Sequence, residues 1–163
     1  MKTFITSAAL TLLALGSGHA LAQSMALKAT TPATSPASAY PMAPAAGLYQ
    51  ALGEQAGIRA LMDDFVVRLK ADPRIGEQFK DTEGDHLAKQ LTDQVCQLTG
   101  GPCVYKGPDM KEAHANMDVT RSHFNALVEV LQTSMNARGM AFTRQNQLLA
   151  LLAPMHRDVV NVR

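Results

Sequence analysis

Residues 96–117 read CQLTGGPCVYKGPDMKEAHANM, and this stretch decides how the rest of the chain can be arranged. It holds both cysteines of the chain, its only Gly-Gly pair and the histidine His114. Two glycines and a proline in succession, Gly100 to Pro102, end any helix that enters the stretch. The tetrad Met110–Ala113 favours one short helical turn. The pattern therefore predicts a broken loop and a single turn that present His114 to something large and flat.

The N-terminus has the pattern of a secretory signal peptide. Lys2 is followed by an apolar run from Phe4 to Leu15 and by the small-residue signature Ala20-Leu21-Ala22. We expect cleavage before Gln23, so that residues 1–22 are removed. The apolar run is shorter than the roughly 20 residues that a membrane-spanning helix needs, although a retained anchor is the alternative. The pattern predicts an exported protein, in a bacterial periplasm, with no membrane attachment after cleavage.

Composition separates a linker from a folded domain. Residues 23–47 are rich in Ala, Pro, Thr and Ser and carry almost no charge, which predicts a disordered linker. Apolar periodicity begins at Leu48, so the domain is predicted to span residues 48–163. The net charge of +1 and the absence of tryptophan give no indication of a nucleic-acid partner.

The domain is predicted to be all-α, because no window alternates with a period of two residues. Apolar residues recur with helical spacing from Ile58 to Leu69, and a short turn at Leu48–Leu52 precedes them. Later helices are predicted in four places: from Asp72-Pro73 to Phe79, from Asp85 to Leu98, from a Thr120 cap to Gly139, and from Thr143 to Val159 with a kink at Pro154. Lys89 and Asp93 are spaced for an ion pair on one helix face.

The two cysteines are predicted to form a disulfide. Cys96 and Cys103 bracket the tight Gly-Gly-Pro turn, and an exported protein meets an oxidising compartment. Closing so short a loop stabilises a fold by about 2.5 kcal/mol in the chain-entropy treatment. The bridge would also fix where the loop leaves the preceding helix. No CxxCH motif is present, which excludes covalent attachment of a c-type haem.

The histidines do not form a conventional metal or catalytic cluster. His86, His123 and His156 flank apolar stripes, where a solvated side chain is the default expectation, and no HxxxH pair supports zinc or di-iron binding. No GxSxG, P-loop, GxGxxG or HExxH motif is present. On local evidence His114 is either a loop histidine bonded to backbone or an axial ligand of a metal whose other ligands come from a porphyrin.

Three separated segments give the chain a family resemblance. They are LYQALGEQAGIRALMDDFVVRLKADPRIGEQF from Leu48, LTGGPCVYKGPDMKEAHANMDVTRSHFNAL from Leu98, and LLALLAPMHRDVV from Leu148. Together they resemble the group I truncated haemoglobins, in the family's order and with its spacings. The resemblance covers nearly all of residues 48–160. It implies a two-over-two helical sandwich around haem, in this case haem b.

The resemblance also implies roles for individual residues. His114 matches the proximal histidine that binds the haem iron, and Phe79 the phenylalanine that wedges against the porphyrin. Phe65 lines the distal side, and Leu87 and Leu91 match distal-helix positions over the iron. The remaining implied cofactor contacts are Val66 next to Phe65, Gln90 next to Leu91 on the distal helix, and Tyr105 and Met110 along the haem edge.

Two departures from the family bear on ligand chemistry. Val66 replaces a tyrosine that many members have after the distal phenylalanine, and Leu91 replaces a frequent glutamine. A polar donor to bound dioxygen contributes about 1.5–3 kcal/mol, so its loss predicts oxygen dissociation about ten- to a hundredfold faster. Gln90 is the candidate to replace that donor. Tight oxygen storage is not expected.

Three functions remain open at this point. The first is reversible binding of a diatomic gas (oxygen, CO or NO), of oxygen-transport type. The second is a haem redox enzyme, such as a nitric oxide dioxygenase or a peroxidase, which needs an unidentified electron donor. The third is a helical interaction module without haem. The sequence does not give the oligomeric state.

Overall fold

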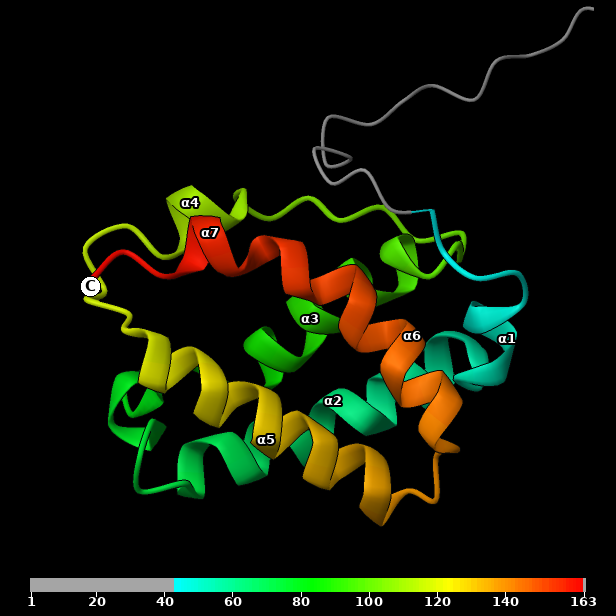
Figure 1. The fold of residues 1–163 in the computed structure, drawn as a ribbon, viewed down its shortest axis with the longest axis horizontal. Coiled ribbons are helices and arrows are strands. Elements are labelled where there is room, and N and C mark those ends of the chain that lie inside the picture. Colours follow the sequence, from blue (N-terminus) through cyan, green and yellow to red (C-terminus); the bar gives the residue numbers. More distant parts are fainter. Residues whose placement is uncertain (1–42, 163) are drawn as a thin grey trace, which may run out of the picture. The chain divides into compact units, whose positions relative to one another are not determined.

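The structure, a computed structural model, describes residues 43–162, and all regular elements in that range are helices, with no strand (Figure 1). The predicted signal peptide, residues 23–42 of the predicted linker and Arg163 lie outside the described residues. No helix between residues 43 and 162 is both long and apolar enough to cross a bilayer. The elements in chain order are α1 (Leu48–Ala51), α2 (Glu54–Ala71), η1 (Gly76–Phe79), α3 (Gly84–Leu98), α4 (Met110–Ala113), α5 (Arg121–Ala137), α6 (Phe142–Leu152), η2 (Ala153–Met155) and α7 (His156–Val159).

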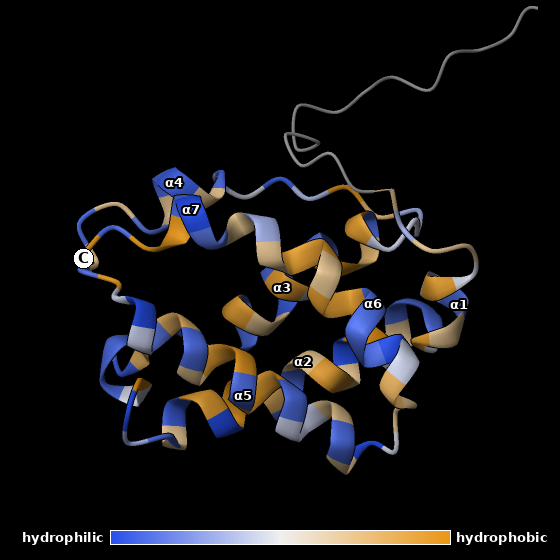
Figure 2. Ribbon diagram, in the orientation of Figure 1, coloured by the Kyte–Doolittle hydropathy of each residue, from blue (hydrophilic) through white to orange (hydrophobic). Residues whose placement is uncertain are grey.

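Helix α2 is the central element of the core. Its inward stripe, from Ile58 to Leu69 with the spacing that the sequence predicts, is buried. It packs against both α3 and α5, and α1 lies against α2 and α6. Gly57 lets α2 begin close to α1, because a Cβ there would lie 2.2 Å from the carbonyl oxygen of Leu52. Apolar and polar residues alternate along the long helices (Figure 2), and the apolar residues of the core are buried.

Helix α3 packs against α2, and α5 packs against both α2 and α6. The inward residues of α5 are more exposed near its start than near its end. Phe124 and Leu127 are half-buried, whereas Leu131 and Met135 are buried. The half-buried residues border an internal cavity, so the helices do not close completely over each other. The short α4 lies against α7 at the edge of this opening.

The prediction of a short helix that begins at Asp72-Pro73 is wrong. The chain forms a turn there, and a 3-10 turn follows. Asp72 does not cap a helix there; its Oδ1 accepts the backbone N–H of Arg74 at 2.8 Å, which forms a turn. Only the 3-10 turn η1 follows. Gly76 packs so close to the preceding helix that a Cβ would lie 2.5 Å from the carbonyl oxygen of Lys70. The side chain of Asp72 is thus engaged by Arg74, and the backbone turns back onto α2 before a regular helix can form.

Several of the predicted helix ends are confirmed. Thr120 Oγ1 accepts the N–H of His123 at 3.2 Å and caps α5, while Gly139, with a φ of 67°, follows its end. Lys89 and Asp93 pair at 2.7 Å. His123 is not a solvated histidine, because its Nδ1 accepts the N–H of Thr120 and contacts Gln78 Nε2.

The last predicted helix is divided. It begins at Phe142 after an Ala141 cap rather than at Thr143, and Pro154 interrupts it. Instead of one kinked helix, the structure has α6, the 3-10 turn η2 and a separate α7. The reason is that proline lacks an amide hydrogen and its ring crowds the preceding turn.

Candidate haem-binding site

A cavity of about 480 Å³ lies between α2, α3, α4, α5 and α6, and residues of η2 and α7 also line it. Its size is within the usual range for small-molecule and cofactor sites. Its walls are mostly apolar. Residues that the sequence analysis did not single out contribute much of this surface, among them Met62, Leu69, Phe124, Leu127, Leu131 and Met155.

The structure places the predicted cofactor-binding residues around this cavity, with one exception. The residues that line it are Phe65, Phe79, Leu87, Gln90, Leu91, Tyr105, Met110 and His114. Val66 does not line it. This residue is buried, with 4% of its surface exposed, and its Cγ1 lies 3.6 Å from the place of a Cβ on Gly84. Val66 therefore packs against the start of α3 instead of facing the cavity.

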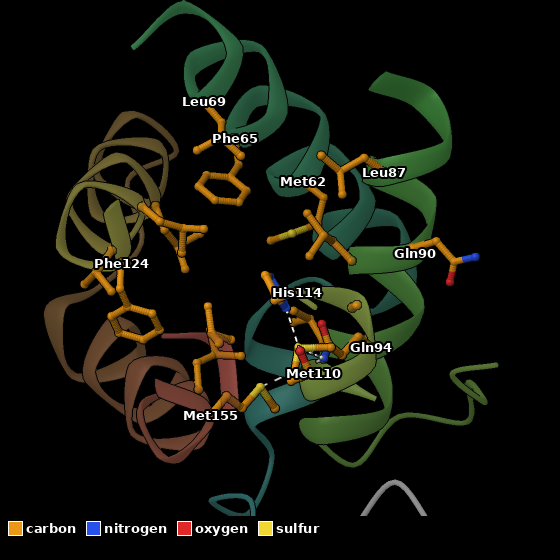
Figure 3. A pocket seen from close by; sticks show the side chains of 18 of the residues that line it. Met62, Phe65, Leu69, Leu87, Gln90, Gln94, Met110, His114, Phe124 and Met155 are labelled. Atoms are coloured by element: carbon orange, nitrogen blue, oxygen red, sulfur yellow. Dashed lines mark hydrogen bonds between the residues drawn. The ribbon is translucent and has the colours of Figure 1, made fainter. Parts of the chain in front are cut away.

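His114 is the residue that the local structure orients most closely. Asp109 precedes α4 and its Oδ1 accepts the N–H of Glu112 at 2.7 Å, which begins the turn. His114 follows the last residue of that turn. Its Nδ1 lies 2.8 Å from the carbonyl oxygen of Met110. Because a carbonyl oxygen only accepts, Nδ1 carries a proton, and in the neutral ring Nε2 keeps its lone pair. The ring lies at the cavity wall (Figure 3).

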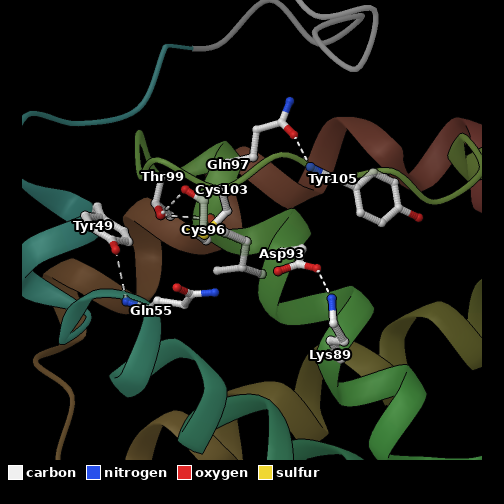
Figure 4. The surroundings of a disulfide bond; sticks show 10 residues. Tyr49, Gln55, Lys89, Asp93, Cys96, Gln97, Thr99, Cys103 and Tyr105 are labelled. Atoms are coloured by element: carbon white, nitrogen blue, oxygen red, sulfur yellow. Dashed lines mark hydrogen bonds and ion pairs between the residues drawn. A yellow bond between two sulfur atoms is a disulfide. The ribbon is translucent and has the colours of Figure 1, made fainter.

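The loop that leads to His114 is tied to the end of α3 (Figure 4). The predicted disulfide between Cys96 and Cys103 is present, with one sulfur in the last turns of α3 and the other in the loop. Gln97 Oε1 then accepts the backbone N–H of Tyr105 at 2.6 Å. Gly101 fits under the bridge only without a side chain, since a Cβ would lie 2.6 Å from Cys96 Sγ and 2.5 Å from the Tyr49 ring.

Tyr105 brings a hydroxyl group to the rim of the cavity. Its hydroxyl donates to the carbonyl oxygen of Pro108 at 2.9 Å. Burial, and next the negative charge of Asp109, raises the pKa of the Tyr105 phenol above its ordinary value. The phenol therefore stays protonated and can continue to donate near neutral pH.

The wall formed by α3 is apolar where it faces the cavity, apart from one amide. Leu87 and Leu91 line it, and Figure 3 shows the Gln90 amide pointing away from the cavity. Gln94 is 9% exposed and its Nε2 contacts only two thioether sulfurs, that of Met110 at 3.4 Å and that of Met155 at 3.9 Å. Thioethers are weak acceptors, so this buried amide is poorly satisfied.

Gln94 is a polar lining residue that the sequence pattern could have indicated. It follows Leu87 by seven residues and Leu91 by three, so helical periodicity places it on the same face. This spacing indicates a lining position, whereas residue type alone favours solvent exposure for a glutamine. Met62, three residues before Phe65, could have been found by the same spacing.

The residues present fit a haem better than a bare metal ion. Within residues 43–162 no group of three or more His, Cys, Asp or Glu side chains could hold a metal. One imidazole with a free Nε2 can bind a metal that brings its other ligands with it, as porphyrin iron does. The apolar walls suit the faces of a porphyrin. An all-helical fold with one such imidazole at an apolar cavity defines a globin-like haem protein.

Comparison with known proteins agrees with this class. Residues 47–161 match the family described as bacterial-like globin. The chain is 33% identical to the group 1 truncated haemoglobin of Tetrahymena pyriformis over 113 residues, which cover 69% of this chain and 93% of that protein. It is 38% identical to the Tetrahymena thermophila protein over 94 residues, which cover 58% and 78% of the two chains. The crystal structure of the T. pyriformis protein in its Fe(III) form superposes with a TM-score of 0.67 at 32% identity, covering 70% of this chain and 97% of that one.

The chain belongs to the bacterial-like globin family, as a group 1 truncated haemoglobin. The predicted all-α, two-over-two globin fold is confirmed. Membership of this family implies a haem with iron and a diatomic gas as ligand.

Proposed function

We propose that this protein binds a diatomic gas (oxygen, CO or NO) reversibly on haem b whose iron is held by Nε2 of His114. The observation that carries the proposal is the 2.8 Å contact between His114 Nδ1 and the carbonyl oxygen of Met110, at the wall of an apolar cavity. That contact fixes the tautomer in which Nε2 is free to bind a metal, and such an acceptor also raises the basicity of the ligand.

The residues of this chain have two roles: some anchor the haem, and others exclude water from the gas-binding side. Haem would supply an iron atom that can bind a diatomic gas. His114 would hold that iron, Phe79 would pack against the porphyrin, and Tyr105 would contact the haem edge. Phe65, Leu87 and Leu91 cover the gas side and keep water and anions out, because none of the three offers a hydrogen bond.

The apolar gas side favours CO and NO over oxygen. Bound dioxygen gains more from a hydrogen-bond donor than CO does, since it carries more negative charge. Leu91 offers no donor, the Gln90 amide points away from the cavity, and the Gln94 amide nitrogen is directed at the sulfurs of Met110 and Met155 (Figure 3). Without a donor worth about 1.5–3 kcal/mol, oxygen leaves about ten- to a hundredfold faster. Transient binding or sensing of a gas therefore suits this site better than oxygen storage.

We also propose that the protein acts outside the cytoplasm, in a periplasm. The support is the signal-peptide pattern of residues 1–22 together with the bridge between Cys96 and Cys103. Disulfides persist in oxidising compartments and are rare where thiols are kept reduced. Mass measurement of the exported protein tests this proposal: an N-terminus at Gln23 supports it, and an intact N-terminus in the cytoplasmic fraction contradicts it.

The ultraviolet-visible spectrum of the ferric, ferrous and CO forms tests the gas-binding proposal. We expect a histidine-ligated haem in the wild-type protein and its loss in His114→Ala, with recovery when imidazole is added. His86→Ala, at an exposed residue of α3, is the matched control and should keep the wild-type spectrum. Unchanged haem binding in His114→Ala would overturn the proposal. Rapid conversion to the ferric form with release of nitrate on mixing with oxygen and NO would favour the redox enzyme instead.

A further inference from the structure

The segment that follows His114 has an unusual backbone. Asn116 and Asp118 have φ values of 62° and 49°, so two non-glycine residues within three positions adopt the left-handed conformation. Asn and Asp tolerate this region better than other residues, but each such position still needs surrounding contacts to hold it. Because the segment begins at the carbonyl group of His114, the contacts that fix the segment also restrict the position of His114.

The contacts that hold this segment come from the residues after α7. Asn161 Nδ2 donates to the carbonyl oxygen of His114 at 2.8 Å. The backbone N–H groups of Asn161 and Val162 both donate to the carbonyl oxygen of Val119, at 3.0 and 3.2 Å. We call these three hydrogen bonds the α7 clasp. The clasp spans the segment from its first carbonyl to its last residue and so closes it at both ends.

The clasp rests on a small apolar cluster of its own. Val119, Met155 and Val159 are buried together, and Met110 and Met117 pack against them. Met110 is also the residue whose carbonyl oxygen lies 2.8 Å from the His114 ring. The cluster thus connects α7 with the turn that carries the histidine, in agreement with the contact between α4 and α7.

We propose that Asn161 is a positioning residue for the iron bond of His114. Within its own turn, the ring and the N–H of His114 both contact the Met110 carbonyl, and the His114 carbonyl accepts the N–H of Met117 at 3.3 Å. Asn161 adds a hydrogen bond to that carbonyl from outside the turn. With this outside contact the ring has one tilt toward the cavity. Without it the turn can rock relative to the residues after α7, and the ring samples a range of tilts. Asn161 is exposed and does not line the cavity, so it acts only through His114. The inference rests on the proposed role of His114 as the iron ligand.

Resonance Raman spectroscopy of the ferrous, ligand-free holoprotein tests the inference, because the iron–histidine stretching band reports the tilt of the ring. Asn161→Asp keeps the shape and the backbone N–H but removes the donor, and Asn161→Ala removes the side chain without adding charge. We expect the band to shift and broaden in both variants. Transfer of haem to an excess of apomyoglobin should become about three- to tenfold faster, the effect of losing one net hydrogen bond. Asn161→Gln should recover part of the wild-type band.

Asn146→Asp, at an exposed residue of α6, is the matched control for the added charge and should leave the band unchanged. A wild-type band in both Asn161→Asp and Asn161→Ala overturns the inference, even where the melting temperature falls, because a purely structural role would lower stability alone. A wild-type protein that shows no iron–histidine band overturns the proposed function first, and this inference with it.

Discussion

The two walls of the cavity are built in different ways. The wall that carries His114 is a short turn held by polar contacts to backbone: the Asp109 cap, the Met110 carbonyl and the Gln97 amide on Tyr105. The opposite wall is the face of the long helix α3, where Leu87 and Leu91 line the cavity. Polar contacts of defined direction fix one nitrogen in one place. An apolar helix face only fills space, so its residues can change without loss of the fold. The first wall anchors the cofactor, and the second selects the ligand.

The largest expected effect comes from making the α3 wall polar. Leu91→Gln places an amide donor at the cavity and should slow oxygen dissociation by about ten- to a hundredfold, with little change for CO. Leu91→Met has a similar volume but no hydrogen-bond donor, so its oxygen dissociation rate should stay close to that of the wild type. Stopped-flow replacement of oxygen by CO measures both rates. An equal change in the two variants would mean that volume, not hydrogen bonding, controls release.

The disulfide tests how far the His114 wall depends on its attachment to α3. The double variant Cys96→Ser with Cys103→Ser should lose about 2.5 kcal/mol of unfolding free energy, since a short loop is opened in the unfolded chain. Denaturation of the holoprotein in urea, compared with the wild-type protein under dithiothreitol, measures this loss. The reduced wild type and the double variant should agree. A double variant as stable as the oxidised protein would show that the bridge is dispensable.

Removal of the Asp109 cap should have a smaller effect. It distinguishes the anchoring of haem from the stability of the fold. Asp109→Ala removes the N-cap of α4, and Thr120→Ala removes that of α5; each should cost about 1 kcal/mol. Only Asp109 belongs to the turn that positions His114. We therefore expect similar melting temperatures for the two variants and faster haem transfer to apomyoglobin from Asp109→Ala. Equal haem transfer rates in the two variants would contradict the assignment of haem anchoring to the wall that carries His114.

The same difference explains what could be predicted from the sequence. Helix α2, the Thr120 cap and the His114 turn follow from local rules, because periodicity, caps and breakers act within a few residues. The 3-10 turn at Gly76 could not be predicted locally, since it depends on how closely the chain returns to Lys70 on α2. The family resemblance placed residues around the cavity, but the orientation of a side chain depends on its neighbours. Val66 packs toward Gly84, and Gln94 rather than Gln90 turns its amide inward.

The smallest predicted effect concerns these two glutamines of α3, which form a natural pair. Gln94 is buried with two sulfur acceptors, whereas the Gln90 amide points away from the cavity. Replacing a poorly satisfied buried amide by an apolar side chain of similar shape is neutral or stabilising, so Gln94→Leu should gain up to about 1 kcal/mol, or roughly 4 °C in Tm. Gln90→Leu should change stability by less than about 0.5 kcal/mol. Thermal unfolding of the two holoproteins measures the difference. A loss of stability in Gln94→Leu would show that the amide has a stronger partner once haem is bound, and the α3 wall would then be less apolar than its leucines suggest.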